Sequence, residues 1–182
     1  MRSAALPPFA AWRHAGARDG FEVAFFAADR KISGTTTAVE DGRAWAVEYT
    51  ITLDEQWRTR EVEIVNQNWA ILLEADGVGG WQIDGGKAAH LAGCLDVDLE
   101  SSALTNAFPV HRLGLEPGEQ ASVPATYVRA ADLSVERLEQ TYRCLEPNRY
   151  AYHAPAFDFS CELHYDPTGL VLEYPGIAVR VA

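Results

Sequence analysis

Hydrophobic and polar residues alternate along most of the chain, with the period of two that is typical of β-strands. The segment 44–53 is the clearest case, because its apolar residues share one face while small or polar residues take the other. We expect the apolar face, formed by Trp45, Val47, Tyr49, Ile51 and Leu53, to line the core or the concave side of a sheet. Similar alternation predicts further strands at 21–28, 35–40, 58–66, 69–75, 81–83, 91–99, 122–129, 135–144, 150–153, 157–165 and 170–174.

Turn sequences separate these strands at regular intervals. Asp41 and Gly42 favour a type I′ hairpin, and further turns rich in Asp, Gly and Pro stand at 76–80, 84–86 and 166–169. Pro175 and Gly176 then begin a predicted tail. Many short strands with regular turns indicate one antiparallel sheet system, so we predict a mainly β fold with residues 1–182 forming a single domain.

The alternation breaks between residues 101 and 113, which form the best candidate for a helix. Pro109 inside this segment leaves two interpretations. Either Ser101 or Ser102 caps a short helix that ends near Ala107, or Pro109 is the first residue of one. We therefore expect one or two short helices beside the sheet.

The charge balance of the chain is strongly acidic. The sequence has 15 basic and 26 acidic residues, which gives a net charge of −11. A negative charge of this size argues against nucleic-acid binding and against stable adsorption to anionic lipid surfaces. A neutral lipid or sugar ligand is compatible with it.

Cysteine usage and the hydrophobic runs bear on the cellular compartment. Cys94, Cys144 and Cys161 are widely spaced and odd in number, unlike a secreted disulfide framework. The first residues lack the apolar core of a signal peptide, and no apolar run approaches the roughly 20 residues of a membrane span. We expect a cytoplasmic protein without stable membrane insertion, whose oligomeric state the sequence leaves open.

Two aspartates alternate with apolar residues in the strand predicted at 91–99. Asp96 and Asp98 lie on one face, which is therefore either half-solvated or lines a polar cavity. Their Cβ atoms are roughly 7 Å apart, a separation that an inverting glycosidase uses for its acid and base. Hydrolysis of a glycosidic bond is one interpretation of this pair. The other gives both acids to solvent or to basic partners.

Two arginines form a second polar feature near the start of the strand predicted at 58–66. Regular alternation puts Arg58 and Arg60 on the apolar face of that strand. In that register they line a wet cavity and pair with a ligand's polar head or with Asp84, Asp96 or Asp98. Alternatively, a bulge shifts the register, and both arginines are solvated or pair with surface acids.

No sequence motif indicates a metal, a cofactor or an activated nucleophile. The histidines and cysteines lack the spacing of metal ligands, and the sequence has no nucleophile elbow, P-loop or dinucleotide-binding glycines. We therefore assign no catalytic residue, no metal and no cofactor.

Six short blocks carry a family resemblance through their order and spacing. They are Trp57-Arg-Thr-Arg60, Asp76-Gly-Val-Gly-Gly-Trp81, Asp84-Gly85, Gly93-Cys-Leu-Asp-Val-Asp98, Thr105-Asn106 and Gly169-Leu-Val-Leu-Glu-Tyr-Pro-Gly176. Through these blocks the chain resembles, over most of its length, the putative glycolipid-binding family of small bacterial proteins. The resemblance implies a curved antiparallel sheet, similar to the half-barrels of periplasmic lipoprotein carriers, with a lipid or glycolipid as ligand.

We therefore expect non-enzymatic binding of a lipid or glycolipid in the concave cavity of a curved sheet. The alternative is a hydrolase that acts on a sugar-containing substrate through an aspartate pair. The candidate ligand-binding residues are Arg58, Arg60, Trp81, Asp84, Asp96, Asp98, Asn106 and Arg112.

Overall fold

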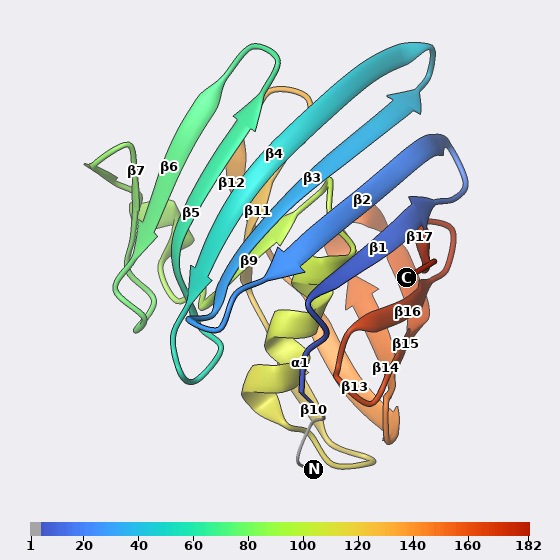
Figure 1. Cartoon of the computed structure of the whole chain (residues 1–182). Coiled ribbons are helices and arrows are strands. Elements are labelled where there is room, and N and C mark those ends of the chain that lie inside the picture. The colour runs from blue at the N-terminus through green and yellow to red at the C-terminus, as the bar shows by residue number, and fades with distance from the viewer. Residues whose placement is uncertain (1–4) are drawn as a thin grey trace.

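The computed structural model describes residues 5–182, which form two β-sheets (Figure 1). The larger sheet is antiparallel throughout and has 14 strands, in the order β10-β13-β14-β15-β16-β17-β1-β2-β3-β4-β5-β6-β7-β8. Its outer strands β10 and β8 do not pair with each other, so the sheet curves without closing into a barrel. The strand bounds are β1 Phe9–His14, β2 Arg18–Phe26, β3 Lys31–Glu40, β4 Arg43–Leu53, β5 Thr59–Asn66, β6 Ala70–Ala75, β7 Trp81–Ile83, β8 Gly86–Lys87, β10 Gln120–Ser122, β13 Thr141–Glu146, β14 Arg149–Ala154, β15 Phe159–Tyr165, β16 Val171–Tyr174 and β17 Ala178–Arg180.

The smaller sheet has three strands and lies behind β3 to β5 in Figure 1. It consists of β9 (Asp96–Leu99), β11 (Ala125–Val128) and β12 (Val135–Leu138), and β9 runs parallel to β11. Thr59 of β5 ties the two sheets together. Its backbone N–H donates to the carbonyl of Leu95 at 3.0 Å, and its hydroxyl accepts from the N–H of Val97 at 3.0 Å.

The fold class predicted from the sequence is confirmed, with one large curved antiparallel sheet and one short α-helix among residues 5–182. The predicted inward face of β4 is also confirmed. Val47, Tyr49, Ile51 and Leu53 are buried in the core, and Trp45 packs against them while partly exposed. The small sheet was not predicted. The segments 122–129 and 135–144, each predicted as one strand, are each divided between the two sheets.

The helix follows neither of the two predicted forms. A 3₁₀ turn, Leu104–Asn106, runs directly into α1 (Ala107–Leu113), and Gly114 ends the helix in a left-handed conformation. Pro109 is therefore the third helical residue. Proline is accepted there because the N–H groups of the first turn have no partner within the helix. Two further 3₁₀ turns span Ala89–Leu91 and Pro155–Phe157.

The predicted tail after Gly176 is wrong in part, because it contains strand β17. This strand pairs with β1, which the sequence pattern also missed, and so joins the two halves of the large sheet. The fully buried Trp12 reinforces the join, since its indole N–H donates to the carbonyl of Val171 at 2.7 Å.

None of the helices within residues 5–182 has the length and hydrophobicity needed to cross a bilayer.

Candidate functional site

A cavity of about 350 Å³ lies between the small sheet and the inner side of β14 to β16. We call it the Asp98 pocket. Its walls combine several aromatic rings with a small number of polar and charged groups. The lining residues are Arg18, Asp98, Leu99, Glu100, Ser102, Asn106, Tyr127, Arg129, Leu138, Tyr152, Ala154, Phe157, Phe159, Tyr174 and Ile177.

The carboxylate of Asp98 is the central polar group of the pocket. It accepts a hydrogen bond from the Thr105 hydroxyl at 3.1 Å and another from the side-chain amide of Gln140. Burial raises the pKa of Asp98 to about 6, although both hydrogen bonds oppose the shift. The neighbouring acids Asp96 and Glu100 raise this pKa further. Asp98 is thus a carboxyl group that gains or loses its proton near neutral pH inside an aromatic cavity.

Tyrosine side chains from the large sheet fix the position of Asn106 beside Asp98. The hydroxyl of Tyr142 donates to Asn106 Oδ1 at 2.8 Å, and that of Tyr165 donates to the Asn106 carbonyl at 3.1 Å. The side-chain amide N–H₂ of Asn106 keeps its donors available to the pocket it lines. The structure thus places Asp98 and Asn106, two of the predicted site residues, in one cavity.

The aromatic walls consist of ring pairs in edge-to-face or tilted contact. Tyr152 and Tyr174 lie 6.0 Å apart at an interplanar angle of 78°, and Phe159 packs against both. Tyr127 and the partly exposed Phe157 form a second pair, with centroids 5.4 Å apart. None of these five residues is among those predicted from the sequence. The available signal was the frequency of tyrosine and phenylalanine between 150 and 174, which marks an aromatic surface without showing what it faces.

Charged groups at the pocket largely neutralise each other. The guanidinium of Arg18 donates to Glu40 at 3.0 Å and lies 3.4 Å from a carboxylate oxygen of Glu100. Arg129 pairs with Glu136 at 2.6 Å. The pocket therefore has no strong excess of either charge.

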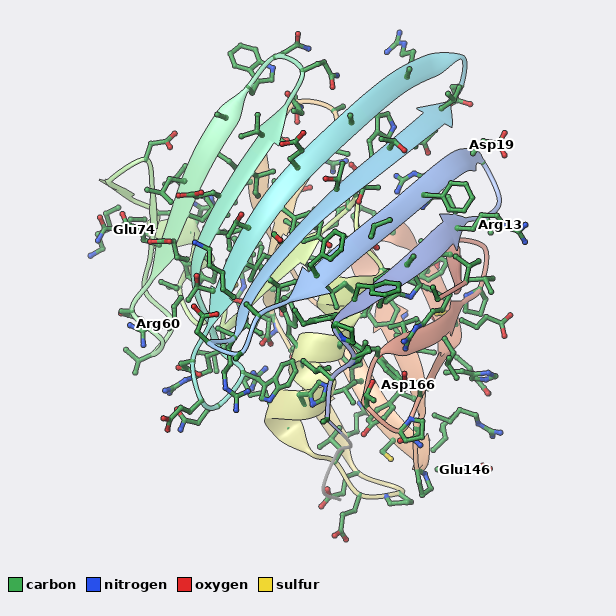
Figure 2. All side chains as sticks on the ribbon, in the orientation of Figure 1. Arg13, Asp19, Arg60, Glu74, Glu146 and Asp166 are labelled. Carbon is green, nitrogen blue, oxygen red and sulfur yellow. The ribbon has the colours of Figure 1, made fainter. Side chains whose placement is uncertain are left out.

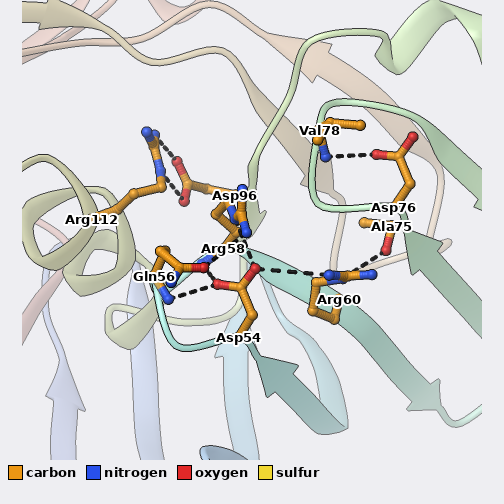
Figure 3. A network of polar contacts seen from close by, with 9 residues as sticks. All are labelled: Asp54, Gln56, Arg58, Arg60, Ala75, Asp76, Val78, Asp96 and Arg112. Carbon is orange, nitrogen blue, oxygen red and sulfur yellow. Dashed lines mark hydrogen bonds and ion pairs between the residues drawn. The ribbon is translucent and has the colours of Figure 1, made fainter.

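Asp96, the other half of the predicted acid pair, is committed to a buried ion pair with Arg112 (Figure 3). Arg112 Nε donates to Asp96 Oδ1 at 3.1 Å, and Nη2 donates to Oδ2 at 2.5 Å. Asp96 is only 1% exposed and is not among the residues that line the pocket. Both oxygens are occupied, so Asp96 is poorly placed to act as an acid or base beside Asp98.

Among residues 5–182, neither Arg58 nor Arg60 forms an ion pair with Asp84, Asp96 or Asp98, in contrast to the expected pairing. The register of β4 and β5 shifts between Thr52 and Leu53, so Arg60 turns outward. This is the bulge that the second interpretation required.

Both arginines gather around Asp54 instead (Figure 3). Arg58 Nε donates to Asp54 at 2.7 Å, while Arg60 lies 3.8 Å from the same carboxylate and donates to the carbonyl of Ala75 at 3.0 Å. Figure 2 shows Arg60 near the outer margin of the molecule, on the same side as Glu74.

The two remaining predicted site residues also lie outside the Asp98 pocket. Trp81 is part of the core at 3% exposure, and its indole N–H donates to the carbonyl of Cys94 at 2.9 Å. Asp84 lies in the turn between β7 and β8, and its carboxylate ties this turn to β6 by accepting from the N–H of Leu72 at 2.9 Å. Both have structural partners that account for their positions.

The described residues, 5–182, contain no group of three or more His, Cys, Asp or Glu side chains that could hold a metal ion.

The raised pKa of Asp98 leads us to predict a specific pH dependence of the protein's stability. Its pKa of about 6 in the folded protein lies above the usual value of 3.8, so the protonated form favours folding. That contribution is complete below pH 3.8 and is lost as the pH rises through about 6. We expect the free energy of unfolding of the wild type to fall relative to that of Asp98→Asn between about pH 4 and about pH 7 in urea titrations. A difference in unfolding free energy between wild type and Asp98→Asn that stays constant over this pH range would contradict the raised pKa of Asp98.

Comparison with known proteins adds to this geometry. A family model described as putative glycolipid-binding matches residues 9–180. The crystal structure of a DUF1089 family protein from Pseudomonas aeruginosa is 30% identical in sequence, with a TM-score of 0.83. The match covers 100% of this chain and 98% of that protein. No curated protein matches the chain.

Proposed function

Because the chain belongs to the putative glycolipid-binding family, we propose that its Asp98 pocket binds the sugar head group of a glycolipid without hydrolysing it. One observation carries the proposal. A single cavity combines five aromatic side chains with the polar side chains of Asp98 and Asn106.

The chemistry of a sugar ring matches this combination. One face of a pyranose ring is made of C–H groups and packs well against an aromatic ring, while its hydroxyls need hydrogen-bond partners. Asp98 supplies acceptors, and the amide of Asn106 supplies donors. Because Tyr142 and Tyr165 hold Asn106 in place, the ligand does not have to order it on binding.

The size of the pocket favours the head group over the lipid part. Its volume of about 350 Å³ is at the lower end of the range of roughly 300–1,000 Å³ for small-molecule sites. We therefore place the acyl part outside the cavity, leaving past Phe157, whose ring is 43% exposed. The near balance of charge among the lining residues suits a neutral sugar.

We also propose that the protein works in the cytoplasm. Cys94, Cys144 and Cys161 are all free thiols, and the first two are buried. Unpaired cysteines are typical of reducing compartments.

The proposal is tested with two phenylalanines of similar exposure. Phe157 and Phe21 are 43% and 50% exposed, but only Phe157 lines the pocket. We expect calorimetric titration to detect binding of at least one alkyl glycoside from a panel of glucosides, galactosides and maltosides. Phe157→Ala should weaken that binding about tenfold or more, equivalent to about 1.4 kcal/mol, whereas Phe21→Ala should leave it unchanged.

Binding of the alkyl alcohol as tightly as the glycoside would contradict head-group recognition. Equal effects of Phe157→Ala and Phe21→Ala on glycoside binding would contradict the placement of the ligand in the Asp98 pocket. Release of the free sugar from any alkyl glycoside during the titration would instead favour the hydrolase alternative.

A further inference from the structure

A second cavity lies at the far end of β2 from the Asp98 pocket. Arg18 at the start of β2 lines the Asp98 pocket, whereas Phe26 at its end lines this second cavity of about 670 Å³. Eight residues of extended strand separate these positions by roughly 26 Å. The buried side chains of the core fill the space between, so the two cavities are separate. We call the second one the Arg30 pocket.

The walls of the Arg30 pocket present polar and apolar surface in nearly equal parts. The large apolar side chains that line it are Leu6, Phe26, Ile32, Leu53 and Trp57, and Arg30 and His111 are its two charged or titratable side chains. Ile32 and Leu53 belong to the buried core, so the pocket reaches from the protein surface to the core.

An aromatic stack organises the polar end of the pocket. The rings of Trp57 and His111 are parallel to within 2°, with centroids 3.6 Å apart. The guanidinium carbon of Arg30 lies 5.6 Å from the centroid of the Trp57 ring. Arg30 is therefore held at the pocket by contact with an aromatic ring rather than by a carboxylate.

Arg30 and Trp57 are also held in an unusual backbone conformation. Their φ angles are +61° and +64°, in the left-handed region that side chains of this size rarely adopt. Both residues close tight turns, because the N–H of Arg30 donates to the carbonyl of Ala27 at 3.3 Å and that of Trp57 donates to the carbonyl of Asp54 at 3.0 Å. Here the two residues line one pocket and contact each other.

The charge of Arg30 is not neutralised by any ion pair among residues 5–182. The acid next to Arg30 in sequence, Asp29, and the acid that follows Leu53, Asp54, both have other partners. Asp54 binds Arg58 at 2.7 Å, and Asp29 accepts from the backbone N–H of Lys31 at 3.3 Å. Burial lowers the pKa of His111 to about 4, so His111 is neutral at pH 7 and Arg30 provides the positive charge.

We propose that the Arg30 pocket binds a fatty acid, with the carboxylate on Arg30 and the hydrocarbon chain against Phe26, Leu53 and Trp57. A guanidinium matches a carboxylate with two parallel hydrogen bonds, and the apolar side chains of the pocket match an alkyl chain. The site is independent of the proposed glycolipid head-group site.

Calorimetric titration of the full chain with laurate, dodecanol and acetate tests this proposal. We expect laurate to bind at least tenfold more tightly than dodecanol, which lacks the charge, and acetate to show no binding because it lacks the chain. Arg30→Gln should weaken laurate binding at least tenfold. Arg43→Gln is the matched control, since Arg43 is another exposed arginine, has no ion pair among residues 5–182 and stands at the opposite end of β4 from Leu53.

Three results would overturn the proposal. If laurate does not bind, or if Arg30→Gln leaves its binding unchanged, the Arg30 pocket is not a fatty-acid site. Acetate binding as tight as that of laurate indicates a site for free anions only. Loss of laurate binding in Phe157→Ala places the fatty acid in the Asp98 pocket instead. Arg30→Gln should leave alkyl glycoside binding unchanged, so the two sites can fail separately.

Discussion

Replacing Arg112 with alanine is expected to lower the free energy of unfolding by about 3–5 kcal/mol. The reason is the charge that the substitution leaves behind. Asp96 is 1% exposed and receives both of its side-chain hydrogen bonds from Arg112. Without the guanidinium, the carboxylate keeps the full cost of its removal from water. Urea unfolding at pH 7 measures the loss.

A matched arginine–aspartate pair provides the control for this prediction. Arg58 and Asp54 are 2.7 Å apart, but their side chains are 30% and 15% exposed, against 15% and 2% for Arg112 and Asp96. Arg58→Ala should therefore cost about 1 kcal/mol or less. Replacing both partners of the buried pair, with Arg112→Met and Asp96→Leu, should recover most of the stability.

The pH dependence of the Arg112 effect separates lost charge compensation from lost packing. Burial already raises the pKa of Asp96, and Arg112 opposes that shift. In the Arg112→Ala variant the pKa rises further, so protonation at low pH removes the uncompensated charge and the deficit should shrink. A deficit of equal size at pH 4 and pH 7 would mean that lost packing causes the effect.

Glu22→Ala should be the second severe substitution, with an expected loss of about 3 kcal/mol or more. Glu22 is completely buried on β2, and its carboxylate accepts from the Tyr49 hydroxyl at 2.7 Å, the Ser102 hydroxyl and the Ala103 N–H at 2.8 Å. Alanine leaves three buried donors without an acceptor, and each unsatisfied donor costs about 1–3 kcal/mol. Thermal and urea unfolding should agree on the size of the loss.

Two further variants sharpen the test of Glu22. Glu48→Ala on the exposed face of β4 should change stability by about 0.5 kcal/mol or less. Glu22→Gln keeps an acceptor oxygen and should lose less than alanine does. Burial raises the pKa of Glu22, so the wild type should also lose stability relative to Glu22→Gln as the pH rises through that pKa. Equal losses for Glu22→Ala and Glu48→Ala would mean that the network contributes nothing.

The predictable parts of the fold are those with local causes. The face of β4 follows from five apolar positions in strict alternation, and the hairpin at Asp41 and Gly42 follows from the turn residues. β1 was missed because two alanines hide its alternation and its partner β17 is remote in sequence. β17 has only three residues, too few for a periodic pattern.

The inward position of Glu22 shows where alternation misleads. In β2 the residues facing inward include Glu22 and Ala24, while Phe21 and Phe25 are 50% and 56% exposed. Hydrophobicity alone would have assigned the faces the other way. The carboxylate of Glu22 points inward because hydrogen-bond donors at Ser102 and Ala103, about 80 residues away in sequence, surround it there. A local sequence pattern cannot reveal a contact between such distant residues.

The candidate site was predicted in part. The alternation at 91–99 placed Asp96 and Asp98 on one face, but it could not tell which of them meets Arg112 and which meets the aromatic cavity. The two arginines at 58 and 60 were misplaced by a one-residue bulge, which reverses the direction of every side chain beyond it. The aromatic walls come from β11, from β14 to β16 and from the 3₁₀ turn at Pro155–Phe157, which meet only in the folded chain.

The junction of β1 with β17 has a consequence for how this sheet assembles. Trp12 and Arg180 are paired across it, while nearly all other neighbours in the large sheet are joined by short hairpins. Closing so long a loop costs little stability, since each doubling of loop length adds only about 0.6 kcal/mol, but remote pairing slows folding. Two arrays of hairpins should therefore form first and dock last at this seam. A circular permutant that links β17 to β1 and opens the turn at Asp41 would make this contact local and would turn β3 and β4 into the remote pair. The contact that forms last should therefore move from the seam between β17 and β1 to the pairing of β3 with β4.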